Sequence, residues 1–170
     1  KNKKIVLMQC NTNYTGASDN YKFINLNVLR LFKKKFPNCI LGLSDHTFGH
    51  ETVLGSIALG ARVIEKHFTD NNFNKGPDHY FSMNPKTWRE MINASRILEK
   101  SLGDGIKRVE KNEIESRVVQ RRAIYVNKNI YPGKKISRKD LILLRPCPKN
   151  AIDPLALDKI INKRAKKIIK

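Results

Sequence analysis

The sequence has few cysteines, and their spacing excludes several classes of protein. Its three cysteines, Cys10, Cys39 and Cys147, lie far apart and form no CxxC pair or zinc-ribbon pattern. An odd number of scattered cysteines does not make a disulfide framework, so we expect reduced thiols. No signal-peptide pattern precedes the first apolar segment. Together these features are typical of a cytoplasmic protein.

Long apolar runs and acidic residues are also scarce. No segment approaches the roughly 20 apolar residues that a membrane-spanning helix needs, so we expect no membrane association. Only 15 residues are acidic against 34 basic ones, which gives a formal net charge of +19. Such a charge favours polyanions, but the lysines are scattered and no nucleic-acid-binding motif is present. We therefore expect no nucleic-acid partner, whereas attraction of small anionic substrates stays open.

The sequence does contain a strand–helix–strand pattern between residues 40 and 68. Two short apolar segments each end at a histidine, His46 and His67, and the segment between them has helical character and ends at Gly60. This order predicts a βαβ unit with parallel neighbouring strands. Because such strands lie about 4.8 Å apart, two histidines at matching strand ends can bind one metal ion.

Ser44 and Glu65 lie two residues before these histidines. Side chains alternate along a strand, so each should share a face with the histidine that follows it. They would then support the metal ligands or contact substrate. The alternative is that each histidine is an ordinary strand-end residue that donates a hydrogen bond to a carbonyl. For the two histidines taken together, the metal site is favoured.

The rest of the first part repeats the strand–helix order. We expect a strand at 4–9, one continuous helix over 18–36, and a helix that begins at Pro85 with Asn84 as its N-cap. A long loop at 69–83 precedes that last helix. Polar clusters follow the strand ends, which is where an α/β barrel or an open α/β sheet places its chemistry.

The chain then changes character. Residues 105–120 are polar with alternating charge and are expected to be a linker, and residues 121–170 predict a small α+β domain of short elements. Residues 1–104 hold only three βα units, whereas a closed (β/α)₈ barrel takes about 250 residues. We therefore expect this chain to be the C-terminal part of a longer protein.

Several motifs, in this order and spacing, resemble the sialic acid synthase family, which includes N-acetylneuraminate synthases and the legionaminic and pseudaminic acid synthases. The motifs are SDHT at 44–47, LGARVIEKHFT at 59–69, GPDH at 76–79, LGDGIK at 102–107 and LLRP at 143–146. The resemblance implies the last three units of a TIM (β/α)₈ barrel at 1–104, followed by an antifreeze-like (SAF) domain at 121–170.

The resemblance also implies a reaction. Such enzymes condense phosphoenolpyruvate with N-acetylmannosamine or a related 2-acetamido sugar and release phosphate. A divalent cation, Mn²⁺ or another such as Mg²⁺ or Co²⁺, binds the open-chain aldehyde. C3 of phosphoenolpyruvate attacks this aldehyde, water adds at C2, and the tetrahedral intermediate loses phosphate. The implied assembly is a domain-swapped homodimer.

Residue roles carry over position by position. The matching residues are His46 and His67 for the metal, Glu65 for catalysis, Ser44 and Thr12 for phosphoenolpyruvate, and Tyr14, Asp78 and Arg145 for the sugar. The sequence departs from the family at 14–17, where YTGA replaces Tyr-Pro-Thr-Pro, and at Thr12, where Ser or Asn is usual. The family's lysines for phosphoenolpyruvate belong to earlier barrel units, so residues 1–170 alone are not expected to catalyse.

Two other functions are compatible with the residues. One is a different metal-dependent barrel enzyme, such as an aldolase or hydrolase, that uses the same two histidines. Dependence on phosphoenolpyruvate would distinguish it from a synthase. The other is a non-enzymatic module whose basic second domain binds carbohydrate or nucleic acid. Salt-sensitive binding without sugar specificity would indicate that module.

Overall fold

The computed structural model describes residues 4–170 as two compact units, divided between Ile106 and Lys107. The second unit therefore includes residues 107–120, which the sequence assigned to a linker. Each unit has its own hydrophobic core, so each is described separately below.

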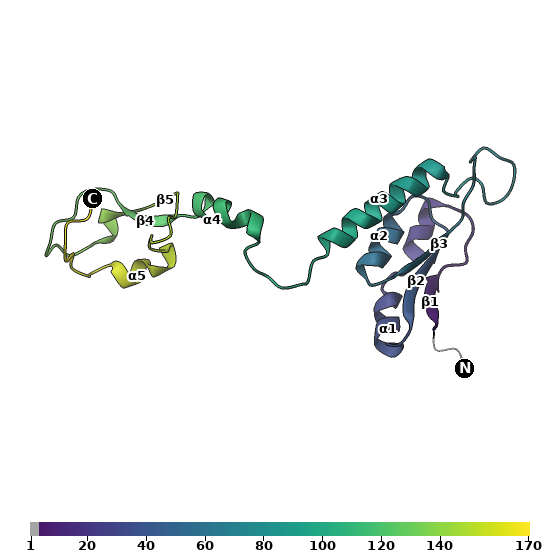
Figure 1. The fold of residues 1–170 in the computed structure, drawn as a ribbon, viewed down its shortest axis with the longest axis horizontal. Helices are drawn as coiled ribbons and strands as arrows, with labels where there is room; N and C mark the ends of the chain where they lie inside the picture. The colour runs from purple at the N-terminus through teal and green to yellow at the C-terminus, as the bar shows by residue number, and fades with distance from the viewer. Residues whose placement is uncertain (1–3) are drawn as a thin grey trace. The chain divides into compact units, whose positions relative to one another are not determined.

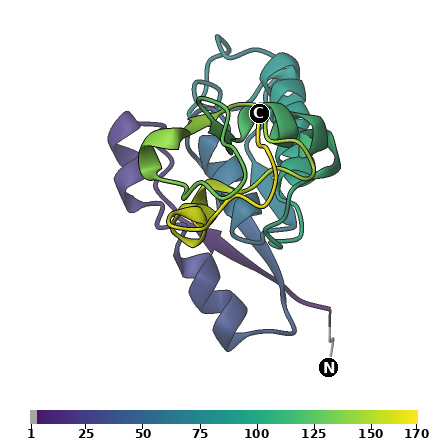
Figure 2. The same cartoon turned by 90° about the vertical axis from the view of Figure 1, so that its left-hand side faces the viewer.

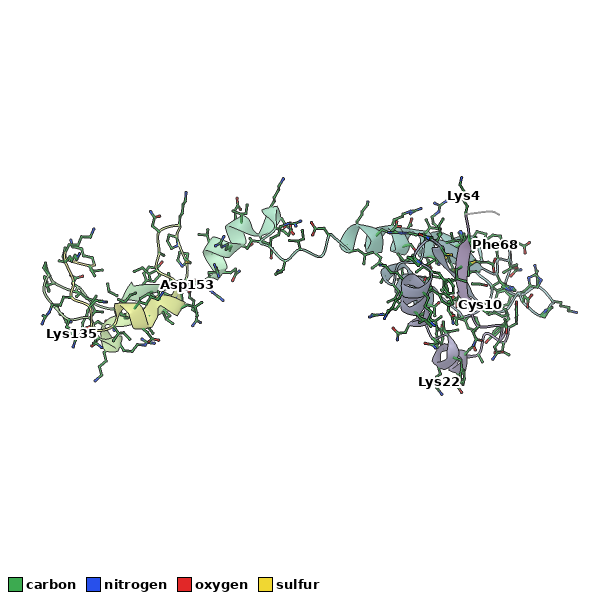
Figure 3. The ribbon with its side chains drawn as sticks, turned by 90° about the horizontal axis from the view of Figure 1, so that it is seen from below. Lys4, Cys10, Lys22, Phe68, Lys135 and Asp153 are labelled. Atoms are coloured by element: carbon green, nitrogen blue, oxygen red, sulfur yellow. The ribbon has the colours of Figure 1, made fainter. Side chains whose placement is uncertain are left out.

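The first unit is built on a three-stranded parallel sheet in the order β1 (Val6–Cys10), β2 (Ile40–Asp45) and β3 (Val63–Lys66). The strands are short and rich in aliphatic residues, as expected for strands of a parallel sheet. This confirms the predicted α/β class and the predicted parallel βαβ unit. Figure 3 shows Lys4 and Cys10 at opposite ends of β1.

Three helices lie on the same side of this sheet in Figure 1: α1 (Val28–Lys35), α2 (Glu51–Ala58) and α3 (Pro85–Ser101). In the core between sheet and helices, Leu43 and Val53 are each 1% exposed. Full burial of one such side chain contributes about 1.5–3 kcal/mol. The helices therefore hold β2, the central strand, by apolar packing on one face.

Two helix boundaries agree with those predicted from the sequence, and a third does not. Asn84 caps α3, since its side chain accepts a hydrogen bond from the backbone N–H of Thr87 at 3.0 Å. Gly60, at φ 105°, ends the turn after α2. The continuous helix expected over 18–36 is wrong. Asn25 has a φ of 50°, which interrupts a right-handed helix and separates the 3₁₀ helix η1 (Ser18–Phe23) from α1.

The second unit contains a two-stranded antiparallel sheet of β4 (Ala123–Val126) and β5 (Leu141–Leu144). Its core is formed by Ile130, Ile136 and Leu141, and the C-terminal segment joins it through a bridge between Ile130 and Ile169. Figure 2 marks the C terminus, which belongs to this unit. Its helices are η2 (Lys111–Glu113), α4 (Ile114–Gln120), η3 (Arg138–Asp140), η4 (Pro154–Ala156) and α5 (Leu157–Ile160).

None of the helices formed by residues 4–170 is both long and apolar enough to cross a bilayer.

Candidate functional site

The C-terminal ends of the three strands bring polar residues together in one row. Cys10 on β1 is in register with Ser44 on β2, and Ser44 is in register with Glu65 on β3. Residues in register share a face of the sheet. His46 and His67 each follow their strand by one residue and lie one step further along this row.

The two histidines lie side by side. Their ring centroids are 5.1 Å apart, and the ring of Tyr14 lies 4.0 Å from His46 and 5.5 Å from His67. Tyr14 comes from the loop after β1, so all three strand ends contribute to the group. The structure thus brings together the two residues that the sequence predicted as metal ligands. Their role as ligands stays a prediction.

The polar contacts of both imidazoles are made through Nδ1 and leave the other nitrogen of each ring free. His46 Nδ1 lies 2.8 Å from the carbonyl oxygen of Asn11, and because a carbonyl only accepts, Nδ1 carries the hydrogen. His67 Nδ1 lies 3.5 Å from Oδ2 of Asp78. Within residues 4–170, neither Nε2 has a hydrogen-bond partner. Metal-bound histidines are commonly held in this way, by a carbonyl or carboxylate on the other nitrogen, so the pair fits a divalent cation.

The described part of the chain offers this cation few other ligands. No group of three or more His, Cys, Asp or Glu side chains converges within residues 4–170. A cation held by His46 and His67 would therefore keep coordination positions for water or an oxygen-bearing substrate. His46 is 4% exposed, whereas the side chain of His67 is 27% exposed, so access to the site is from the His67 side.

Ser44 and Glu65 form a second pair beside the histidines. The Ser44 hydroxyl donates to Oε1 of Glu65 at 2.7 Å. Glu65 is exposed, so its other oxygen can accept a hydrogen bond from a ligand. A carboxylate at this position is suited to bind sugar hydroxyls or to exchange a proton with them.

The remaining predicted residues lie in different places. Asp78 contacts His67 and so lies beside a candidate metal ligand. Its contact with the sugar stays a prediction. Thr12 is exposed in the loop after β1, and its hydroxyl forms no hydrogen bond within residues 4–170. Arg145 is exposed directly after β5 in the second unit. The structure of the first unit therefore groups Ser44, Glu65, His46, His67, Tyr14 and Asp78.

Sequence reasoning missed a buried ion pair on the opposite face of the sheet. Nζ of Lys66 lies 2.5 Å from Oδ2 of Asp45, and these side chains are 2% and 0% exposed. The two residues are in register on β3 and β2. Each directly precedes one of the histidines, so they point to the face that the helices cover. Opposite charges at these two positions were the available signal.

A tyrosine links two of the loops around the site. The Tyr21 hydroxyl donates to the carbonyl of Phe48 at 2.8 Å, which joins the segment after β1 to the loop after β2. Burial raises the pKa of this hydroxyl, and the carboxylate of Glu51 raises it further. Tyr21 therefore stays protonated and able to donate at neutral pH.

Comparison with known proteins places this chain in a family. A family model described as the NeuB family matches residues 1–107, and an SAF domain model matches residues 121–170. The chain belongs to the NeuB family. This confirms the predicted resemblance to sialic acid synthases and the predicted SAF domain.

NeuB-family relatives align along almost the whole chain. An N,N'-diacetyllegionaminic acid synthase of Legionella pneumophila is 36% identical over 94% of this chain and 43% of its own length. A pseudaminic acid synthase of Campylobacter jejuni is 34% identical over 100% of this chain and 48% of its own. A crystal structure of the spore coat polysaccharide biosynthesis protein SpsE of Bacillus subtilis has a TM-score of 0.54 at 30% identity, over 99% of this chain and 51% of that one. The chain thus spans about half the length of these relatives.

Proposed function

We propose that the protein containing this chain condenses phosphoenolpyruvate with N-acetylmannosamine or a related 2-acetamido sugar, giving a nonulosonic acid and phosphate. The observation that carries the proposal is the pairing of His46 and His67, with ring centroids 5.1 Å apart and both Nε2 atoms free of hydrogen bonds within residues 4–170. The names of the relatives support the product class.

His46 and His67 would hold a divalent cation, Mn²⁺, Mg²⁺ or Co²⁺, through Nε2. When bound, such an ion supplies Lewis-acid polarisation of a sugar aldehyde. Asn11 and Asp78 fix the two rings through Nδ1. A neutral imidazole adds no negative charge, so this ligand set leaves the cation strongly polarising.

The neighbouring residues would orient the two substrates. Glu65 accepts hydrogen bonds from sugar hydroxyls and serves as the carboxylate that exchanges a proton, while Ser44, already hydrogen-bonded to Glu65 at 2.7 Å, faces the phosphate of phosphoenolpyruvate. Thr12 is a further candidate on the phosphoenolpyruvate side. Tyr14 packs on both histidines and would limit the volume available to the sugar.

The proposal extends to the assembly. The three parallel strands would be the last three units of a TIM barrel, with the candidate site at its carboxyl end, where barrel enzymes bind their substrates. Arg145 would contact the sugar in the active site of the other subunit of a domain-swapped homodimer. A guanidinium suits this role because it donates several hydrogen bonds in a fixed plane.

The test is phosphate release by the full-length protein supplied with phosphoenolpyruvate, a 2-acetamido sugar and Mn²⁺. We expect His46→Ala and His67→Ala each to lower the rate about 100-fold or more, because a lost metal ligand removes several kcal/mol of charge stabilisation. His50→Ala is the matched control, since His50 precedes α2 and its side chain forms no hydrogen bond within residues 4–170.

Two results would contradict the proposal. If either His46→Ala or His67→Ala keeps full activity at limiting Mn²⁺, the metal site is assigned wrongly. If a reaction depends on both histidines but not on phosphoenolpyruvate, the protein is another metal-dependent enzyme.

A further inference from the structure

We propose that the buried Asp45–Lys66 ion pair is a positioning device that holds His46 and His67 at the separation needed to bind one cation. This inference rests on the proposed metal site and adds two residues to it. Neither residue faces the cation, so neither is a catalytic residue.

The pair links the two histidine-bearing strands at the level of the site. Asp45 is the last residue of β2 and directly precedes His46, while Lys66 is the last residue of β3 and directly precedes His67. Their side chains meet on the helix-covered face. A bond between these two positions therefore constrains the backbone from which both imidazoles project.

The same network fixes the chain on the other side of His46. Nζ of Lys66 donates to the backbone carbonyl of Thr47 at 2.8 Å, and the Thr47 hydroxyl donates to Oδ1 of Asp45 at 2.9 Å. Both peptide neighbours of His46 are thus tied to Lys66. The loop after β2 cannot move away from β3 at this point without breaking buried hydrogen bonds.

A helix completes the network. The Thr52 hydroxyl, on α2, donates to Oδ2 of Asp45 at 2.7 Å. Asp45 therefore accepts hydrogen bonds from a strand, a loop and a helix, and all of these groups are buried. Full satisfaction of a buried polar network is what makes it rigid.

Stability alone does not explain this arrangement. Desolvation of two charges offsets most of their attraction, and apolar residues of similar volume often serve stability as well or better. A rigid link between two ligand-bearing strands gives the pair a function that apolar packing lacks, because metal affinity depends on how well the ligands are held in place.

The test replaces the pair by apolar residues in the full-length protein. In the double variant Asp45→Val/Lys66→Met, no buried charge is left unpaired, and the Thr47 and Thr52 hydroxyls, 3.1 Å apart, can still bond each other. We expect this variant to fold with an unchanged circular dichroism spectrum but to bind Mn²⁺ about tenfold more weakly, as for other residues that orient metal ligands. The Kd is measured by titrating free Mn²⁺ with electron paramagnetic resonance.

Ser56→Ala is the matched control. Ser56 is fully buried on α2 and donates to the carbonyl of Val53 at 2.8 Å, away from the histidines. Its loss removes a buried hydrogen bond from the same helix, and we expect the Kd for Mn²⁺ to be unchanged.

The outcomes separate this inference from the proposed function. A folded double variant with wild-type affinity for Mn²⁺ overturns the positioning role and leaves the metal site in place. A wild-type protein whose Mn²⁺ binding does not depend on His46 overturns both. If the double variant does not fold, the neutral polar pair Asp45→Asn/Lys66→Gln decides: it removes the ion pair and leaves no buried charge, and an unchanged Kd for Mn²⁺ overturns the inference.

Discussion

Each unit of the chain has a buried aspartate that binds a lysine and hydroxyl or amide groups, but the two lysines lie in opposite surroundings. In the first unit, Asp45 and its partner Lys66 are 0% and 2% exposed. In the second unit, Asp140 is 4% exposed, but its partner Lys134 is 41% exposed. The acceptor is buried in both units, whereas the lysine is buried only in the first.

This difference in lysine exposure indicates that the two aspartates have different roles. Lys134 keeps much of its hydration, so its 2.8 Å hydrogen bond to Asp140 costs little desolvation. Asp140 also accepts from the backbone N–H and the hydroxyl of Ser137, which forms a capping box around η3. This aspartate stabilises a local turn, whereas the Asp45 network links two strands beneath the candidate site.

The largest effect on stability is expected from Asp45→Asn. This change leaves the Lys66 ammonium buried without a countercharge, which should lower the free energy of unfolding by about 3 kcal/mol or more. Urea unfolding of the full-length protein measures the loss, and hydrogen exchange should locate it in peptides that cover β2 and β3.

The double variant Asp45→Val/Lys66→Met provides the internal control for that result. It removes both charges at once, so its loss of stability should be much smaller than that of Asp45→Asn. An equal loss in both would show that the pair contributes net stability, which would remove the contrast with Asp140.

Some of this arrangement was predictable from the sequence, for physical reasons. Alternation along a strand, with parallel pairing, sufficed to place His46 beside His67 and Ser44 beside Glu65. The Asn84 cap and the Gly60 helix end followed from local chemistry. In each case the deciding interaction lies within a few residues or between neighbouring strands.

Other features depend on tertiary structure and could not be predicted from local patterns. The break at Asn25 was missed because the apolar spacing over 18–36 is helical throughout. Phe23, one of the apolar residues in that spacing, is 64% exposed. Opposite charges at 45 and 66 could have indicated the ion pair itself, but its further partners come from a loop and a helix, so no local pattern indicated the rest of the network.

An intermediate effect is expected from Asp140→Asn, and it should depend on pH. The Lys134 ammonium, and then the Ser137 N–H and hydroxyl, lower the pKa of the Asp140 carboxyl well below its ordinary value. A carboxylate with a lowered folded-state pKa stabilises above its unfolded pKa of about 3.9 and loses that contribution as pH falls further. The variant should therefore melt several degrees lower than wild type at pH 7.

The difference in melting temperature between wild type and Asp140→Asn should shrink below about pH 4. Thermal unfolding at a series of pH values measures it, and hydrogen exchange near η3 assigns it to the second unit. A gap that stays constant down to pH 2 would mean that the Asp140 charge contributes nothing, and that only the shape of the side chain matters.

The smallest effect is expected at Lys22, which extends the comparison to a pair with no burial. Lys22 Nζ lies 2.8 Å from Oδ1 of Asp19, close to the Lys134–Asp140 distance, but these side chains are 70% and 81% exposed. Water and salt screen both charges, so Lys22→Gln should change the free energy of unfolding by less than about 1 kcal/mol, as measured by urea unfolding. A loss as large as that of Asp45→Asn would show that contact distance, rather than burial of both partners, determines the effect. A negligible loss would leave burial as the variable that separates Lys22, Asp140 and Asp45.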